Sequence, residues 1–74
     1  MDKNSKLKIK LANGSITARE LRTLLLVEGW QLDRTRGSHE FWVNGAKTYV
    51  LATHGKDLKR YQMKQASQLL LTEE

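Results

Sequence analysis

Residues 30–52 read WQLDRTRGSHEFWVNGAKTYVLA, and this stretch decides the fold. Apolar and polar residues alternate along it with a period of two, which is typical of β-strands that bury one face. Two dipeptides, Arg36-Gly37 and Asn44-Gly45, interrupt the alternation, and Asn-Gly is a strong signal for a two-residue hairpin turn. The pattern therefore predicts three consecutive antiparallel strands, the last of them over residues 47–52.

A helix is predicted on each side of these strands. Thr17-Ala18-Arg19-Glu20 matches a capping box, and Gly29 is typical of the residue that follows a helix, so the first helix should run from about Ala18 to Glu28. A second helix should run from about Lys59 to Leu70. Its apolar stripe consists of Met63, Ala66, Leu69 and Leu70.

The order helix, three strands, helix predicts an α+β fold. Neighbouring strands pair with each other, so both helices must cover one face of a three-stranded antiparallel sheet. The other face is left for water or a partner. The economical arrangement is an α-β-β-β-α sandwich like that of double-stranded-RNA-binding domains.

The first fifteen residues look like a separate piece. Residues 6–11, KLKIKL, alternate charged and apolar side chains, which predicts a half-buried strand. Such a strand would add to an edge of the sheet, and its lysines would discourage further pairing. A mobile basic arm is the alternative. We therefore expect an arm or edge strand over residues 1–15 and a globular domain over residues 16–74.

Length and composition restrict the class of protein. The 74 residues form one domain at most, and the absence of cysteine excludes disulfides, thiolate zinc sites and thiol nucleophiles. A net charge of +5 favours a polyanion such as nucleic acid, although a basic tail can also serve solubility alone. No apolar run approaches the roughly 20 residues that span a bilayer. We expect a small cytoplasmic protein that does not enter membranes.

Cationic and imidazole side chains are expected to meet at one rim of the sheet. A turn at Arg36-Gly37 predicts three cross-strand pairs, which are Trp30 with Val43, Leu32 with Phe41, and Arg34 with His39. The apolar members of these pairs share a face and should face the helices. The next hairpin would bring Val50 or Leu51 opposite His39. Five residues would then converge: Arg34, Arg36, His39, His54 and Lys56.

A histidine among cations suits phosphate chemistry. Neutral imidazole removes a proton from a ribose 2′-hydroxyl, imidazolium protonates a leaving 5′-oxygen, and arginine or lysine holds the phosphate. The same pattern also fits a hydrogen-bonded core histidine at position 39 and a loop cap at His54. Two histidines without a fixed local spacing make a weak metal site, so no metal or cofactor is expected.

Trp42 alternates with Phe41 and Val43 and is therefore predicted to point away from the helices. On an open face it would stack on a base or anchor a protein interface, the latter being the role of a purely structural or interaction protein. Packing under the N-terminal segment is the third possibility.

Four blocks of sequence follow one another in an order that characterises a known family. They are Ala18-Arg19-Glu20-Leu21 with Leu24-Leu25, Glu28-Gly29-Trp30, Arg34-Thr35-Arg36-Gly37-Ser38-His39 with Phe41, and His54-Gly55-Lys56-Asp57-Leu58. With these blocks, residues 17–70 resemble the HicA family of small toxin ribonucleases.

The resemblance implies a double-stranded-RNA-binding-like fold, metal-independent cleavage of mRNA, and a HicB-like antitoxin that covers the active site. The family's catalytic histidine, in its Gly-Ser-His turn, falls on His39. Ser38 would orient the turn or touch phosphate, while His54 and Lys56 would help to hold RNA. The family often has a different polar residue at position 40, where Glu40 would either orient His39 or repel phosphate. A HicA-like module that binds RNA without cutting it is the alternative.

Overall fold

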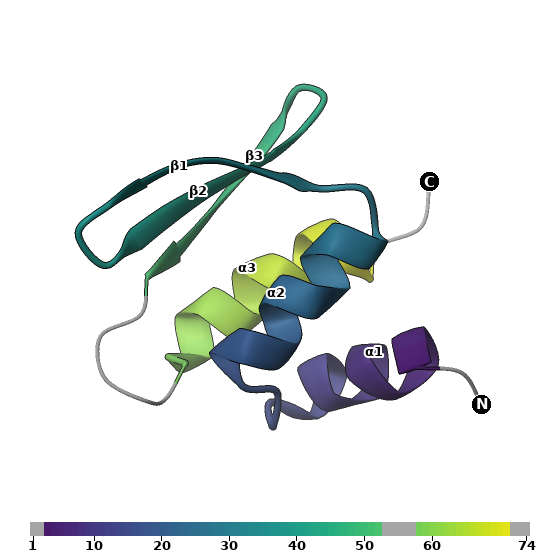
Figure 1. The fold of residues 1–74 in the computed structure, drawn as a ribbon. Coiled ribbons are helices and arrows are strands. Elements are labelled where there is room, and N and C mark those ends of the chain that lie inside the picture. Colours follow the sequence, from purple (N-terminus) through teal and green to yellow (C-terminus); the bar gives the residue numbers. More distant parts are fainter. Residues whose placement is uncertain (1–2, 53–57, 72–74) are drawn as a thin grey trace.

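The structure is a computed structural model that describes residues 3–52 and 58–71, and it has an α+β fold. Its elements are α1 (Lys3–Asn13), α2 (Ala18–Val27), β1 (Gln31–Arg36), β2 (His39–Asn44), β3 (Lys47–Ala52) and α3 (Arg60–Leu70). The strands form an antiparallel sheet in the order β1-β2-β3, and α2 and α3 cover one face of it (Figure 1). The predicted helix–three strands–helix order is confirmed.

The capping box at the start of α2 is formed as predicted. The Thr17 hydroxyl accepts a hydrogen bond from the Glu20 backbone N–H at 3.1 Å, and the Glu20 carboxylate accepts one from the Thr17 N–H at 3.0 Å. The Lys10 ammonium and these contacts with Thr17 hold the pKa of the Glu20 carboxyl below its ordinary value. Gly29 has φ 93°, a left-handed conformation that turns the chain towards the sheet.

The N-terminal segment is a helix, so the prediction of an added edge strand or arm is wrong. Leu7 and Leu11 are spaced one helical turn apart and are both buried, whereas Ile9 is 47% exposed. A strand would have placed all three on one face. As Figure 1 shows, α1 packs against the side of α2 and α3 that faces away from the sheet, where ion pairs from Lys8 to Glu28 and from Lys10 to Glu20 also join it to the α2 region.

The register of β1 on β2 differs from the prediction. The turn residues are Gly37 and Ser38, which pairs Arg36 with His39 and Arg34 with Phe41. An irregularity between Leu32 and Arg34 then shifts the register, so that Leu32 pairs with Trp42. This bulge at Asp33 inserts one extra residue into β1 and reverses the alternation of its side chains, which a strict period of two cannot anticipate.

The second hairpin has the same kind of turn, with Gly45 and Ala46 at its centre. Asn44 therefore pairs with Lys47, and Ala52 pairs with His39. The prediction that Val50 or Leu51 would lie opposite His39 is wrong by one or two residues. In both turns glycine occupies the first central position with positive φ, 58° at Gly37 and 61° at Gly45, as a type II′ turn requires.

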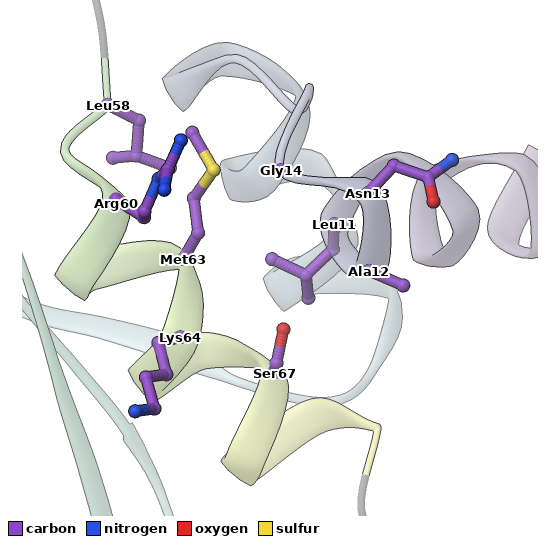
Figure 2. A pocket seen from close by; sticks show the side chains of 9 residues that line it. All are labelled: Leu11, Ala12, Asn13, Gly14, Leu58, Arg60, Met63, Lys64 and Ser67. Carbon is purple, nitrogen blue, oxygen red and sulfur yellow. The ribbon is translucent and has the colours of Figure 1, made fainter.

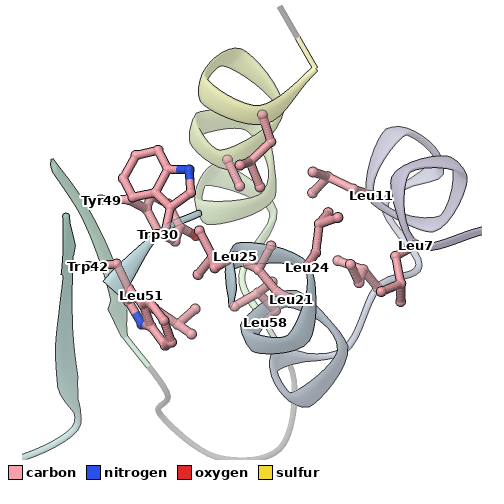
Figure 3. Close-up of a cluster of buried hydrophobic side chains, with 13 residues drawn as sticks. Leu7, Leu11, Leu21, Leu24, Leu25, Trp30, Trp42, Tyr49, Leu51 and Leu58 are labelled. Carbon is pink, nitrogen blue, oxygen red and sulfur yellow. The ribbon is translucent and has the colours of Figure 1, made fainter. Parts of the chain in front are cut away.

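β2 packs on the helices through the face opposite to the predicted one, whereas Trp30, which precedes β1, is buried in the core as predicted. Trp42, Tyr49 and Leu51 are at most 3% exposed and point towards α2 and α3, where they join the leucines of the core (Figure 3). The Tyr49 hydroxyl also donates a hydrogen bond to the backbone carbonyl of Gln62 in α3 at 3.0 Å. Residues 39–44, HEFWVN, have apolar side chains on both faces, so Trp42 was assigned to the wrong one.

None of the helices formed by residues 3–52 and 58–71 has the length and apolar character that crossing a membrane requires.

Candidate functional site

His39 is the first residue of β2 and follows directly after the turn formed by Gly37 and Ser38. It is exposed, and its register partners place it on the outer face of the sheet, opposite to the face that buries Trp42. The possibility of a core histidine is therefore wrong. The strand presents the imidazole to solvent at the end of the sheet where the chain reverses direction.

Arg36 and Arg34 share the outer face with His39. Arg36 is the cross-strand neighbour of His39, and Arg34 is the neighbour of Phe41, which follows His39 on that face. Paired residues of antiparallel strands have their Cβ atoms about 4.5–5.5 Å apart. The expected pairing of Arg34 with His39 is wrong, but the expected grouping of two guanidinium groups with this histidine holds.

The Arg34 guanidinium is held over the sheet by an aromatic ring. Its central carbon lies 4.3 Å from the centroid of the Phe41 ring, and its Nη1 donates to the Asp33 carboxylate at 2.7 Å. Both members of this ion pair are about half exposed, so the pair contributes little to stability. The ring contact instead orients the planar group, and a guanidinium has five N–H donors, enough for a bidentate phosphate contact besides the bond to Asp33.

Three further residues were expected at this site. Ser38 is half-buried in the turn beside His39, so it lies where the sequence placed it. His54 and Lys56 belong to residues 53–57 and lie outside the described residues. The part of the candidate site that lies within the described residues therefore comprises His39, Arg36, Arg34 and Ser38.

Glu40 is on the helix-facing side of β2 and does not share the outer face with His39. Its two carboxylate oxygens accept hydrogen bonds from Arg22 Nε at 3.0 and 2.9 Å, and Arg22 Nη2 lies 2.8 Å away. The Trp42 indole N–H donates to the same carboxylate at 3.1 Å. Glu40 was expected to orient His39 or to repel phosphate, but its carboxylate points to the helices, where this network ties the sheet to α2.

Arg22 was not identified from the sequence. The spacing of Glu40 and Trp42 is the signal that could have indicated the network, since residues two apart on a strand share a face. A buried indole N–H needs an acceptor, and a carboxylate on the same face supplies one. The carboxylate in turn needs a cation from the helix packed against it.

A hollow of about 560 Å³ lies between the end of α1 and the start of α3. Figure 2 shows its apolar part, formed by Leu11, Leu58 and Met63, and the two cations Arg60 and Lys64 that also line it. None of the described site residues contributes to its wall. Over residues 3–52 and 58–71, no cluster of three or more histidine, aspartate or glutamate side chains is arranged to hold a metal ion.

Comparison with known proteins identifies the family. The family model described as HicA toxin of bacterial toxin-antitoxin matches residues 18–70, from the start of α2 to the end of α3. No curated protein and no solved structure matches the chain. The matched region covers well over half of the 74 residues and leaves α1 outside it. The chain therefore belongs to the HicA family, the toxins of bacterial toxin–antitoxin systems.

Proposed function

We propose that this toxin is an endoribonuclease that cleaves mRNA without a metal ion, with His39 as its catalytic residue. The observation that carries the proposal is the position of His39, an exposed imidazole at a tight turn, directly across from Arg36 on the open face of the sheet. Membership of a toxin family gives such a site a role, since a toxin needs an activity that harms the cell.

The proposed reaction is a transesterification within the RNA strand. Neutral His39 takes the proton from a ribose 2′-hydroxyl, whose oxygen attacks the adjacent phosphorus. The bond from phosphorus to the 5′-oxygen breaks, and the imidazolium returns a proton to that oxygen. The products are a 2′,3′-cyclic phosphate and a 5′-hydroxyl, so no water or metal ion enters this step.

The arginines contribute binding and charge. The Arg36 and Arg34 guanidinium groups supply N–H donors to the non-bridging phosphate oxygens, where negative charge increases in the transition state. Phe41 offers an aromatic ring on the same face, and the Arg34 group already covers it, so this pair forms a platform for the neighbouring nucleotide. Ser38, His54 and Lys56 complete the proposed RNA contacts.

We propose a HicB-like protein as the antitoxin. Family membership implies a cognate antitoxin, and a neutralising partner would have to cover the outer face around His39. RNA and antitoxin would then compete for the same two arginines.

Induced expression in a bacterial host tests the proposal. Wild-type protein is expected to arrest growth and to fragment mRNA, and His39→Ala is expected to do neither at the same protein level. Gln31→Ala is the matched control, because Gln31 is exposed on the same face at the far end of β1 and should leave toxicity intact. Undiminished toxicity of His39→Ala would refute the role of His39, and RNA binding without any fragments from the wild type would favour a non-catalytic RNA-binding module.

A further inference from the structure

The two edges of the described sheet differ in how well they are protected against pairing with another strand. The β1 edge has a bulge at Asp33 and charges at Arg34 and Arg36, which are devices that discourage strand addition. The β3 edge has only Lys47 at its first position, followed by the uncharged run TYVLA. Tyr, Val and Thr favour strands, so β3 is the edge that is suited to accept a partner strand.

The backbone of β3 offers hydrogen bonds in a defined pattern. Asn44 and Lys47 flank a two-residue turn and form its closing hydrogen-bonded pair. Since hydrogen-bonded and non-hydrogen-bonded pairs alternate, Thr48 and Val50 direct their N–H and C=O groups away from β2. Within residues 3–52 and 58–71, β2 is the only strand that pairs with β3.

A hollow of about 370 Å³ follows this edge. Three consecutive residues line it, Thr48, Tyr49 and Val50. Because neighbours along a strand point to opposite faces, they can line one hollow only if it runs along the strand's edge. The opposite wall is α3, through Gln65, Gln68 and Leu69. The hollow therefore leaves space beside β3 for an added chain.

Charge indicates which kind of chain would fit. Within the spans of β3 and α3 the charged residues are Lys47, Arg60 and Lys64, and neither span contains Asp or Glu. Lys47 belongs to β3 itself, whereas Arg60 and Lys64 line the hollow beside α1, and the hollow beside β3 is lined by uncharged residues. The whole chain carries +5, so a second copy of it would bring like charge to the same edge. An acidic segment from a different protein is the complementary occupant.

We propose that the β3 edge takes up an extended, acidic segment of the cognate antitoxin as a fourth strand of the sheet. Main-chain bonds to Thr48 and Val50 would give affinity, and the net positive charge of the chain would favour acidic residues. The proposal rests on the chain being the toxin of a toxin–antitoxin pair and is independent of the role of His39. It gives the antitoxin an anchor outside the outer-face site.

Hydrogen exchange and affinity measurements with the cognate antitoxin test this directly. The amides of Thr48 and Val50 are expected to exchange rapidly in the free toxin and to become protected in the complex, whereas those of Tyr49 and Leu51 are protected in both. Val50→Pro removes one outward N–H at an edge position that tolerates proline, and is expected to weaken binding by about tenfold or more. Val50→Thr keeps the N–H and is the matched control.

A charge pair on the facing helix supplies a test that leaves the strand unchanged. Gln65 is exposed, so Gln65→Glu and Gln65→Lys should both fold. Gln65→Glu is expected to weaken antitoxin binding severalfold, and Gln65→Lys is expected to strengthen it. Both changes in affinity should become smaller at high salt. Unchanged affinity in Val50→Pro and both Gln65 variants, or no new protection at Thr48 and Val50, would overturn the proposal, while RNA cleavage by the free toxin would still stand. Self-association of the wild type that Val50→Pro abolishes would also overturn it, since a second copy would then occupy the edge.

Discussion

Replacing Glu40 is expected to destabilise the fold without changing the chemistry at His39. In Glu40→Ala the Trp42 indole N–H, in a residue that is 3% exposed, loses its acceptor, and an unsatisfied buried donor costs about 1–3 kcal/mol. The ion pair with Arg22 is also lost, and because the Arg22 side chain is 37% exposed we assign it only about 1 kcal/mol. The sum is about 2–4 kcal/mol. For a domain of this size, such a loss lowers Tm by roughly 10–25 °C.

Thermal unfolding by circular dichroism and RNA cleavage below the lowered Tm are the assays. Glu40→Gln keeps an acceptor for the indole and removes the charge, so it should lose only about 1 kcal/mol. In a double-mutant cycle, Arg22→Ala and Glu40→Ala should show a coupling energy of about 0.5–1 kcal/mol. The cleavage rate per folded molecule should match that of the wild type in each variant. A Glu40→Ala protein with unchanged Tm and a much lower cleavage rate would refute this reasoning and return Glu40 to the reaction centre.

Two further predictions concern the core. Leu11→Ala should lower the free energy of unfolding in urea by about 2–4 kcal/mol, because Leu11 is only 1% exposed on α1. Ile9→Ala should lower it by less than about 0.5 kcal/mol, because Ile9 is 47% exposed. Equal losses in the two variants would favour the strand interpretation. Burial raises the pKa of the Tyr49 hydroxyl, so its contribution to stability should be complete below the ordinary tyrosine pKa of about 10 and should fall as pH rises above it. Tyr49→Phe should lower the free energy of unfolding at pH 7 by about 1 kcal/mol, because the hydrogen bond to the Gln62 carbonyl is lost. Its stability should also decrease less than that of the wild type as pH rises. A pH profile of stability that is unchanged from the wild type would contradict this assignment.

Local signals in the sequence were sufficient for most elements of the fold. The capping box at Thr17 located the start of α2 to the residue, and glycine at Gly37 and Gly45 marked both hairpins. These features depend on a few adjacent residues and on backbone sterics. They predicted the order and type of every element from α2 to α3.

The errors arose where a local pattern fits two structures. In residues 6–11 the spacing of Leu7 and Leu11 fits one face of a helix as well as one face of a strand, and packing on α2 and α3 decided between them. In β2 apolar residues lie on both faces, and the larger buried set of Trp42 with Tyr49 and Leu51 determined which face meets the helices.

The candidate site was partly predictable for the same reason. A tight turn keeps Arg36 next to His39 in any register close to the observed one, so this grouping survived the register error. The Arg22–Glu40–Trp42 network depends on which face of β2 meets α2, which is a tertiary choice, and it was therefore missed.

Single-turnover cleavage of an end-labelled RNA in excess EDTA tests the central claim most directly. We expect wild-type toxin to produce fragments ending in a 2′,3′-cyclic phosphate, and His39→Ala, with an unchanged circular dichroism spectrum, to reduce the rate by at least about a hundredfold, which is the lower range for loss of a general base. Glu40→Gln, assayed beside it, should cleave at the wild-type rate. A folded His39→Ala protein that cleaves as fast as the wild type, or activity that EDTA abolishes, would contradict the account.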